Sequence, residues 1–511
     1  MAMKNTGDTI SAGGKIFTLG KKIGGGTEGM VFDVLDYPNY VIKLLNTAKM
    51  SDNEKLDTLN RLKWLKDNIG NSELKQKLAI PRALIDEDLG YIMVNANEHK
   101  KLDIYFAYPR DEQEFKQWLK DDFRLKKRFQ IISFMFSSLE KIHIHGLIFT
   151  DLSPNNIMVH TDKNNLVFID TDNMRKRDDP YTGVLGTDGY MAPEIYHLMD
   201  KKLNDKLKEK NIKIDREISF VNKLTVDSDI FSAAVIAFQL LTLQHPFVGD
   251  NAENGTAEEE TEARHCRTDY ILHRNRTNIC TTNPFIHLFE NRETVSDDLF
   301  RLFYKTFVDG KLQPKLRPTA LEFFDACNKA LDMIIKCPDC GVDVLYNTGK
   351  FDKCWYCDSQ LPEQIHLKIF SAYEVPDRAS LISKITDSNY SSNSITGENN
   401  FELSDIVLTV QETKYLNMKH FERTTGNSSA LFAITLIDDM SKIIKIQVNM
   451  QENNAITANS LLVHKQNKTV VPIDKAKEFP CDEYDICFEL LNTRVGKIRT
   501  YGRIFKGRKE W

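Results

Sequence analysis

An acid and an amide stand five residues apart in the stretch LIFTDLSPNNIMV, residues 147–159. Apolar runs flank Asp151 and Asn156 on both sides, which is typical of a short loop between two buried strands. Asp, Ser, Pro and Asn are also the ordinary residues of a polar turn. This stretch alone therefore fits a turn as well as a reactive loop, and the rest of the chain must decide between them.

A glycine-rich stretch near the N-terminus, IGGGTEGMV, has the spacing GxGxxGxV at Gly24, Gly26, Gly29 and Val31. Glycine lets a backbone approach phosphate oxygens because no Cβ stands in the way. The same pattern also fits a hairpin turn. The next apolar run, YVIK, ends at Lys43, and such a lysine can simply mark where a strand meets water. Together, the glycine hairpin and the strand lysine indicate a nucleotide clamp.

These features resemble the eukaryotic-like protein kinases, including their bacterial branch, from about Gly20 to Leu331, or roughly three-fifths of the chain. Seven motifs follow one another in the order of that family, which makes coincidence remote. They are the glycine loop, Lys43, LEKIHIHGLIFTDLSPNNIMV, Asp170, GTDGYMAPE, DSDIFSAAVIAFQLLTLQHPF and LRPTALEF. The resemblance implies an α+β, bilobal protein-kinase-like fold that binds ATP and Mg²⁺.

The resemblance also assigns roles to individual residues. It makes Asp151 the catalytic aspartate, which accepts or orients the proton of the attacking hydroxyl, and Lys43 the second catalytic residue, which binds phosphates. It makes Asn156 and Asp170 oxygen ligands of magnesium. It pairs Arg317 with Glu194, and it starts a buried helix near Asp229. The expected ATP site comprises Ile23, Gly24, Gly26, Gly29, Val31, Val41, Lys43, Glu54 and Met93.

Some residues of this predicted ATP site can also be explained without a bound nucleotide. Val41 and Met93 are expected to line the adenine pocket, but ordinary strand core explains them equally well. Lys43 needs an anionic partner, and Glu54 is our choice because it lies in the first turn of a helix predicted over residues 51–68. Asp57 and Glu73 are alternatives, and Glu54 also fits as a favourable charge at a helix N-terminus.

The chain departs from the family pattern at four places. Phe149-Thr150 replaces His-Arg, Ser153 replaces a lysine, Asp170-Thr171-Asp172 replaces Asp-Phe-Gly, and Glu28 replaces an aromatic loop tip. The lysine, the catalytic acid and the metal ligands remain, which favours an atypical but competent kinase. Without the arginine, nothing reads a phosphate on the activation segment. We therefore expect activity to be largely independent of phosphorylation at its candidate sites, Thr182 and Thr187.

Four of the nine cysteines form two CxxC pairs separated by thirteen residues, Cys337 with Cys340 and Cys354 with Cys357. This spacing is typical of a tetrahedral four-sulfur zinc site and resembles a zinc ribbon. Buried cysteines or a redox pair are the alternatives, but two pairs so close together favour structural Zn²⁺. Four sulfur ligands leave no position for water, so we expect no chemistry at the metal.

The hydrophobic pattern predicts how the chain is divided. Strands and one helix precede residue 98, helices dominate up to about 336, and short strand-like runs with polar turns follow residue 405. Residues 376–404 are rich in Ser, Asn and Asp and are expected to form a linker. The expected parts are a loose N-terminus (1–15), a kinase domain (16–335, lobes 16–97 and 98–335), the zinc ribbon (336–362), a connecting segment and linker (363–404) and a β-rich domain (405–511).

The composition of the chain limits the classes of function that it can have. The net charge of -5 gives a nucleic-acid partner no support, and the longest apolar stretch, FSAAVIAFQLL, is too short to span a membrane. The paired cysteines favour a reducing, cytoplasmic setting. The leading hypothesis is an ATP-dependent Ser/Thr protein kinase with a protein substrate, a signalling role and a protein partner for its β-domain. The second is a nucleotide-binding pseudokinase scaffold, and the third is a small-molecule kinase.

Overall fold

The fold is taken from a computed structural model that divides into two compact units. The first comprises residues 1–112, 131–287 and 300–323, and the second comprises residues 113–130, 288–299 and 324–511. The structure describes residues 4–26, 29–48, 50–70, 72–109, 111–121, 124–160, 165–177, 186–197, 225–346, 352–361, 365–371, 402–410, 412–417, 420–421, 430–438, 442–448, 457–467, 469–493 and 496–506.

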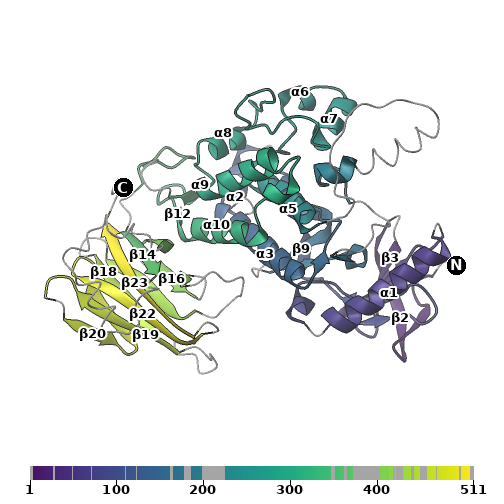
Figure 1. Cartoon of the computed structure of the whole chain (residues 1–511), viewed down its shortest axis with the longest axis horizontal. Helices are drawn as coiled ribbons and strands as arrows, with labels where there is room; N and C mark the ends of the chain where they lie inside the picture. Colours follow the sequence, from purple (N-terminus) through teal and green to yellow (C-terminus); the bar gives the residue numbers. More distant parts are fainter. Residues whose placement is uncertain are drawn as a thin grey trace. The chain divides into compact units, whose positions relative to one another are not determined.

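The first unit begins with a six-stranded antiparallel sheet in the order β1-β2-β3-β4-β6-β5 (Figure 1). The N-terminus was expected to be loose up to residue 15, and this is wrong from Thr9 onward. Ile10 and Ala12 are buried, so this short segment has an apolar face that pairs with β2. The strands are β1 (Thr9–Ala12), β2 (Lys15–Gly25), β3 (Gly29–Val34), β4 (Tyr40–Leu45), β5 (Ala83–Leu84) and β6 (Gly90–Val94).

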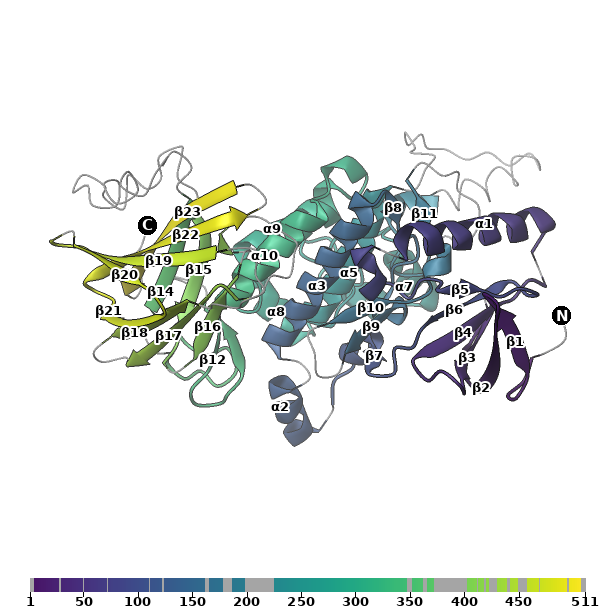
Figure 2. The ribbon, with the colours of Figure 1, turned by 90° about the horizontal axis from the view of Figure 1, so that it is seen from below.

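Helix α1 (Asp52–Ile69) confirms the helix predicted over residues 51–68 and lies close to the sheet in both views (Figure 2). Its start is fixed by a capping box, in which the Ser51 hydroxyl accepts the Glu54 amide and the Glu54 carboxylate accepts the Ser51 amide. One face of the helix is buried through Thr58, Leu62, Leu65 and Ile69.

Helix α5 (Val226–Thr242) is the apolar helix predicted from the sequence. From Ser228 to Thr242 every residue of α5 except Gln239 is buried. Aromatic rings pack around Phe238, with Tyr270, Phe303 and Phe307 each within 6 Å of it, centroid to centroid. The other helices are α2 (Glu112–Lys120), α3 (Leu125–Ile144), α6 (Asp250–Glu253), α7 (Ala257–Arg264), α8 (Pro284–Glu290), α9 (Asp297–Tyr304) and α10 (Ala320–Asp332).

Two strongly charged stretches interrupt the helical part of the chain, residues 200–217 and 249–265. Residues 249–265 form α6 and α7, and α7 has its own capping box between Thr256 and Glu259. Residues 200–217 lie outside the described residues. Among the helices that the structure describes, none has both the length and the apolar character that a bilayer crossing requires.

Two small sheets frame the loop that carries Asp151. A two-stranded sheet joins β8 (Leu147–Ile148) to β11 (Arg175–Lys176), and a three-stranded sheet has the order β10-β9-β7. Its strands are β7 (His99–Lys101), β9 (Ile157–His160) and β10 (Leu166–Phe168). Asp151 and Asn156 thus lie between β8 and β9, as the flanking apolar runs predict.

The second unit contains the cysteine pairs and a β-rich region. Strands β12 (Ile334–Lys336) and β13 (Asp343–Leu345) form a hairpin beside the first cysteine pair. A six-stranded sheet, β15-β14-β23-β22-β19-β20, and a four-stranded sheet, β16-β17-β18-β21, share one apolar core. The β-rich region was expected from residue 405, but it begins at β14, because β14 pairs with both β15 and β23.

The strands of this region are β14 (Ile365–Ser371), β15 (Glu402–Leu408), β16 (Thr413–Leu416), β17 (Phe432–Asp438), β18 (Ile443–Val448), β19 (Thr457–His464), β20 (Val470–Ile473), β21 (Ala476–Pro480), β22 (Tyr484–Thr493) and β23 (Gly496–Lys506). Strand-like runs were predicted after residue 405, and β15, β17, β18, β20 and β22 correspond to DIVLTVQ, ALFAITLI, IIKIQVNM, TVVPI and DICFELL. The predicted linker, residues 376–404, lies outside the described residues up to residue 401.

A buried ion pair in the first unit joins the GTDGYMAPE segment to the LRPTALEF segment, as the resemblance to protein kinases implies. Both guanidinium Nη atoms of Arg317 donate to the carboxylate of Glu194 at 2.7 Å, and the Ser228 hydroxyl donates to the same carboxylate at 2.9 Å. The side chains are 0% and 11% exposed. Because removing one partner leaves a buried charge alone, this pair is a sensitive point of the fold.

Arg317→Ala should lower the free energy of unfolding by about 3–5 kcal/mol, since Glu194 would keep its charge without a partner. Urea unfolding followed by tryptophan fluorescence measures the change. Lys315→Ala is the matched control, because Lys315 is 78% exposed and its pair with Asp227 should contribute about 1 kcal/mol or less. Equal effects of the two substitutions would contradict this account.

Candidate functional site

Asp151 lies at the centre of a hydrogen-bonded cluster in the loop between β8 and β9. The Asn156 amide nitrogen donates to the Asp151 carbonyl and to its carboxylate Oδ2, both at 2.9 Å. The Thr187 hydroxyl donates to the other carboxylate oxygen, Oδ1, at 2.7 Å. Asp151 is 8% exposed. The carboxylate is therefore held in one orientation by two neighbours, one of which comes from the GTDGYMAPE segment.

Hydrogen bonds to Asp229 of α5 hold the backbone of this loop in place. The Asp229 carboxylate accepts hydrogen bonds from the amides of Phe149 at 2.7 Å and Thr150 at 3.1 Å. It also lies 3.0 Å from the Nε2 atom of His143. Thr150 adopts a left-handed backbone conformation, with φ of 71°. Such a conformation is unfavourable for a β-branched residue, and the two amide contacts hold the loop in place despite it.

The surroundings of Asp151 make it a better proton acceptor than an ordinary aspartate. Burial raises its pKa, and the hydrogen bonds from Thr187 and Asn156 offset this only in part, so the pKa lies above its usual value. A general base works best when its pKa approaches the working pH. The group that the sequence analysis assigns as catalytic acid or base therefore has a suitable environment.

Lys43, on β4, is paired with two carboxylates that follow β10. Its ammonium nitrogen lies 3.0 Å from Asp170 Oδ1 and 2.6 Å from Asp172 Oδ1. Burial lowers the pKa of Lys43, but the acidic groups around it more than reverse this, and the pKa lies well above its ordinary value. Lys43 is therefore a buried, charged group beside the reactive loop.

The expected pairing of Lys43 with Glu54 is wrong. Glu54 is occupied at the N-terminus of α1, where its carboxylate accepts hydrogen bonds from the amide and the hydroxyl of Ser51. The two alternatives are also paired elsewhere: Asp57 with Arg61 and Arg175, and Glu73 with Lys141. The physical reason is local, because a capping box engages a carboxylate with the nearest backbone amides before a distant lysine can reach it.

Asn156 and Asp170 fit the role of magnesium ligands. Both side-chain hydrogen bonds of Asn156 use its amide nitrogen Nδ2, which leaves the side-chain oxygen for a metal. The backbone connects the two residues, because the Ile169 amide donates to the Asn156 carbonyl at 2.9 Å. Asp170 has a left-handed φ of 56°, and its carboxylate is one-third exposed. Carboxylate and amide oxygens are the donors that Mg²⁺ prefers.

Most of the apolar residues assigned to the ATP site lie in one cluster. Val31, Val41 and Met93 pack together, and Val167 and Ile169 of the segment around β10 join them. This cluster fits an adenine-binding wall. Ile23, by contrast, is 48% exposed and does not belong to the cluster.

The glycine loop is a hairpin in which Gly24 pairs with Val31 and the Gly26 amide donates to the Gly29 carbonyl at 3.0 Å. A Cβ at Gly29 would lie 2.3 Å from the Leu44 carbonyl oxygen, so packing explains this glycine. A Cβ at Gly26 would meet nothing within 4 Å. Packing against the described residues therefore does not explain Gly26, and the open space beside it fits a close approach of phosphate. Glu28, at the expected loop tip, lies outside the described residues.

Sequence reasoning missed three partners in this site. Thr187, considered only as a phosphorylation candidate, contacts Asp151, while Thr182 lies outside the described residues. Asp172, noted only as a departure from Asp-Phe-Gly, contacts Lys43, and the Tyr91 hydroxyl donates to Asp172 at 2.9 Å. An acid two positions after Asp170 was a visible signal, whereas nothing in the sequence pointed to Tyr91.

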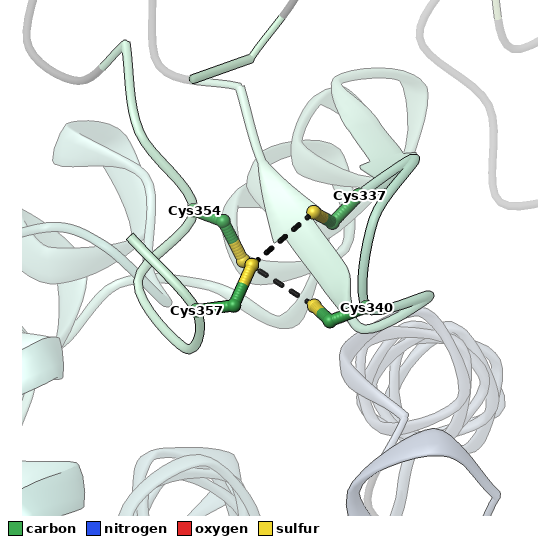
Figure 3. Close-up of side chains that lie close together, drawn as sticks. All are labelled: Cys337, Cys340, Cys354 and Cys357. Carbon is green, nitrogen blue, oxygen red and sulfur yellow. Dashed lines mark hydrogen bonds between the residues drawn. The ribbon is translucent and has the colours of Figure 1, made fainter. Parts of the chain in front are cut away.

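The four cysteines predicted to bind zinc converge in the second unit, with their sulfur atoms toward one another (Figure 3). All four sulfurs lie within 4.8 Å of one another, and Cys337–Cys357 and Cys340–Cys354 are each 3.7 Å apart. Tetrahedral zinc with bonds of about 2.3 Å places sulfurs about 3.8 Å apart. The spacing of the sulfurs therefore fits this metal without rearrangement.

The surroundings of the cysteine cluster support metal binding. Hydrogen bonding to Ser359 lowers the pKa of Cys357 to about 6, which favours the thiolate that metals require. The cluster has a small apolar core that includes Ile335, Val344 and, from β15, Val407. Asp343 of the hairpin accepts the Lys126 amide at the start of α3 at 2.9 Å. The cysteine-rich segment is thus fixed to both a helix and a strand of its unit.

Comparisons with known proteins agree with this geometry. The protein kinase domain model matches residues 17–327. Protein kinase YegI of Escherichia coli K12 is 23% identical over 350 residues, covering 66% of this chain and 48% of YegI. YegI of Escherichia coli O157:H7 is 23% identical over 362 residues, covering 68% and 49%. The chain thus spans about half the length of these curated relatives. Because the domain model covers more than half of the chain and the motif residues meet in one site, the chain belongs to the protein kinase family.

Proposed function

We propose that this protein is an ATP- and Mg²⁺-dependent kinase that phosphorylates Ser or Thr hydroxyls of a protein substrate in cytoplasmic signalling. The observation that carries the proposal is the joint placement of Asp151, Asn156 and Thr187 in one hydrogen-bonded cluster. Lys43 and Asp170 lie in the same unit and contact each other. Phosphoryl transfer depends on positioning and charge, and these residues supply both.

Each residue has a distinct task in this mechanism. Asp151, oriented by Asn156 and Thr187, takes or directs the proton of the acceptor hydroxyl. Lys43 offers a positive charge to the phosphates, and the open side of Gly26 lets the backbone approach them. Asn156 and Asp170 would hold magnesium. When bound, this ion offsets the negative charge that develops on the transferred group.

A protein acceptor is supported by the way the GTDGYMAPE segment is fixed. Besides the contact of Thr187 with Asp151, the Tyr196 hydroxyl accepts the Gly189 amide at 2.7 Å, and Glu194 is bound by Arg317. In the family that this chain resembles, the segment shapes the protein-substrate site. The choice of Ser and Thr over other hydroxyls, like the bilobal arrangement, rests on that resemblance.

Asp151→Asn should lower kcat about 10²–10⁴-fold with the fold intact, because an amide cannot accept the proton. The assay combines purified protein, labelled ATP, magnesium and a generic protein acceptor, and also reads autophosphorylation. Asp52→Asn, with a side chain 99% exposed, is the matched control and should retain full activity. Wild-type turnover in the Asp151 variant would remove the assignment. Wild-type protein that binds ATP but transfers nothing would favour the pseudokinase scaffold.

We also propose that the cysteine cluster binds one structural Zn²⁺ ion and that the β-rich region recruits a protein partner. A segment of about twenty-one residues has too little core to fold without such a metal. Four thiolates saturate a tetrahedral ion, so the site has no position for a reacting water. The shared core with Val407 supports a structural connection between the cysteine segment and the β-rich region.

Metal analysis should find one zinc per chain. Chelation or Cys354→Ser should unfold residues 337–361 and loosen strand β15, read as faster hydrogen exchange there, while ATP binding persists. Cys327→Ala is the matched control, because Cys327 is a buried cysteine outside the cluster, and it should retain the metal. A folded, fully reduced protein that contains no zinc would defeat the prediction. Loss of ATP binding on chelation would contradict the independence of the two sites.

A further inference from the structure

The strongest contact of Lys43 is to a residue that has no assigned role in the reaction. Its ammonium lies 2.6 Å from Asp172, and the two side chains are 4% and 7% exposed. The contact with Asp170 is longer, at 3.0 Å, and Asp170 is 32% exposed. Charge-assisted contacts gain strength where water is excluded. Asp172 is therefore the principal anion that holds Lys43 in place.

Asp172 is itself held by several elements. The buried Tyr91 hydroxyl of β6 donates to Asp172 Oδ1 at 2.9 Å, and Arg61 Nε of α1 donates to the Asp172 carbonyl at 2.7 Å. The carboxylate of Asp172 therefore cannot turn away from Lys43 without breaking its contacts with Lys43 and Tyr91.

The residues on either side of Asp172 are fixed as well. The Thr171 hydroxyl donates to the Ala79 carbonyl at 3.0 Å. The Thr150 hydroxyl donates to the Asn173 carbonyl at 2.8 Å, which connects the turn to the loop that carries Asp151. This turn, residues 171–173, is a single 3₁₀ turn that starts directly after Asp170.

Helix α1 faces this turn with a cation. Arg61 donates to the Asp172 carbonyl, and the carboxylate of Asp57 is bound by Arg61 and Arg175. Among the described residues, the carboxylate of Glu54 accepts hydrogen bonds from the amide and the hydroxyl of Ser51. Within the described residues, no carboxylate of α1 lies within ion-pair distance of Lys43.

We propose that Asp172 is the positioning residue of Lys43, so that the lysine is anchored by the turn after Asp170 and not by helix α1. This inference rests on the proposed phosphoryl transfer. It divides two tasks between neighbouring carboxylates: Asp170 remains available to a metal, while Asp172 keeps the ammonium directed at the phosphates.

The test compares Asp172→Asn with Glu54→Gln and with the control Asp52→Asn, and measures kcat and the Kd values of Mg-ATP and of adenosine. Asp172→Asn should lower kcat about 100-fold. It should raise the Kd of Mg-ATP about tenfold, since the lysine loses its direction. The Kd of adenosine should stay within about twofold, because adenosine reports the apolar wall and carries no phosphate. A purely structural role would weaken adenosine binding to the same extent.

Each outcome of this comparison either supports or overturns the role of Asp172. Asp172→Asn with normal kcat, or Glu54→Gln with the larger loss, overturns the inference. If Asp172→Asn fails to bind adenosine, Tyr91→Phe replaces it and should show the same preferential loss for Mg-ATP in smaller measure; no loss overturns the inference. If the wild-type protein transfers no phosphate, the proposed function fails. The role of Asp172 is then read from the ratio of the Mg-ATP and adenosine Kd values alone.

Discussion

The ion cluster around Lys43 is the constraint on which the catalytic arrangement depends. An ammonium group that is 4% exposed is tolerated only with anionic partners nearby, because an unpaired buried charge is very unfavourable. Both partners come from residues 170–172, far along the chain from β4. The cluster therefore joins the N-terminal sheet to the turn that supplies Asp170, and the Thr150 contact to that turn extends the connection to Asp151.

The motif residues could be predicted from the sequence, because their order along the chain is informative without any knowledge of distances. Arg317 and Glu194 are 123 positions apart and meet as the resemblance implies. The partner of Lys43 could not be chosen in this way, since acids on several elements were candidates. One signal was overlooked: Ser51 and Glu54 have the S-x-x-E spacing of a capping box, which predicts that Glu54 is occupied at its own helix. Strands β1 and β14 were also missed, because a short segment becomes a strand only through its partners.

The cysteine cluster differs from the Lys43 site, because its own residues could be predicted from the sequence and only its neighbours could not. The convergence of its four cysteines could be predicted from spacing alone, because few arrangements bring two CxxC pairs together. Its neighbours do not follow from spacing. Asp343 lies at the N-terminal end of α3, where a helix has amides without partners and favours an anion. This contact depends on how the hairpin packs within its unit, which no local pattern in the sequence specifies.

The position of the lysine anchor also bears on how such a site would be controlled. Kinases that hold the lysine with a glutamate on the following helix can be switched by moving that helix. Here α1 brings Arg61 to the turn, so its displacement would remove a hydrogen bond to the Asp172 carbonyl but no anion from Lys43. The proposed lysine anchor Asp172 lies in this short turn and the proposed metal ligand Asp170 directly precedes it, so formation of the turn sets both. This arrangement supports the expectation that activity is largely independent of activation-segment phosphate, since Phe149-Thr150 stands where the arginine that binds that phosphate would be.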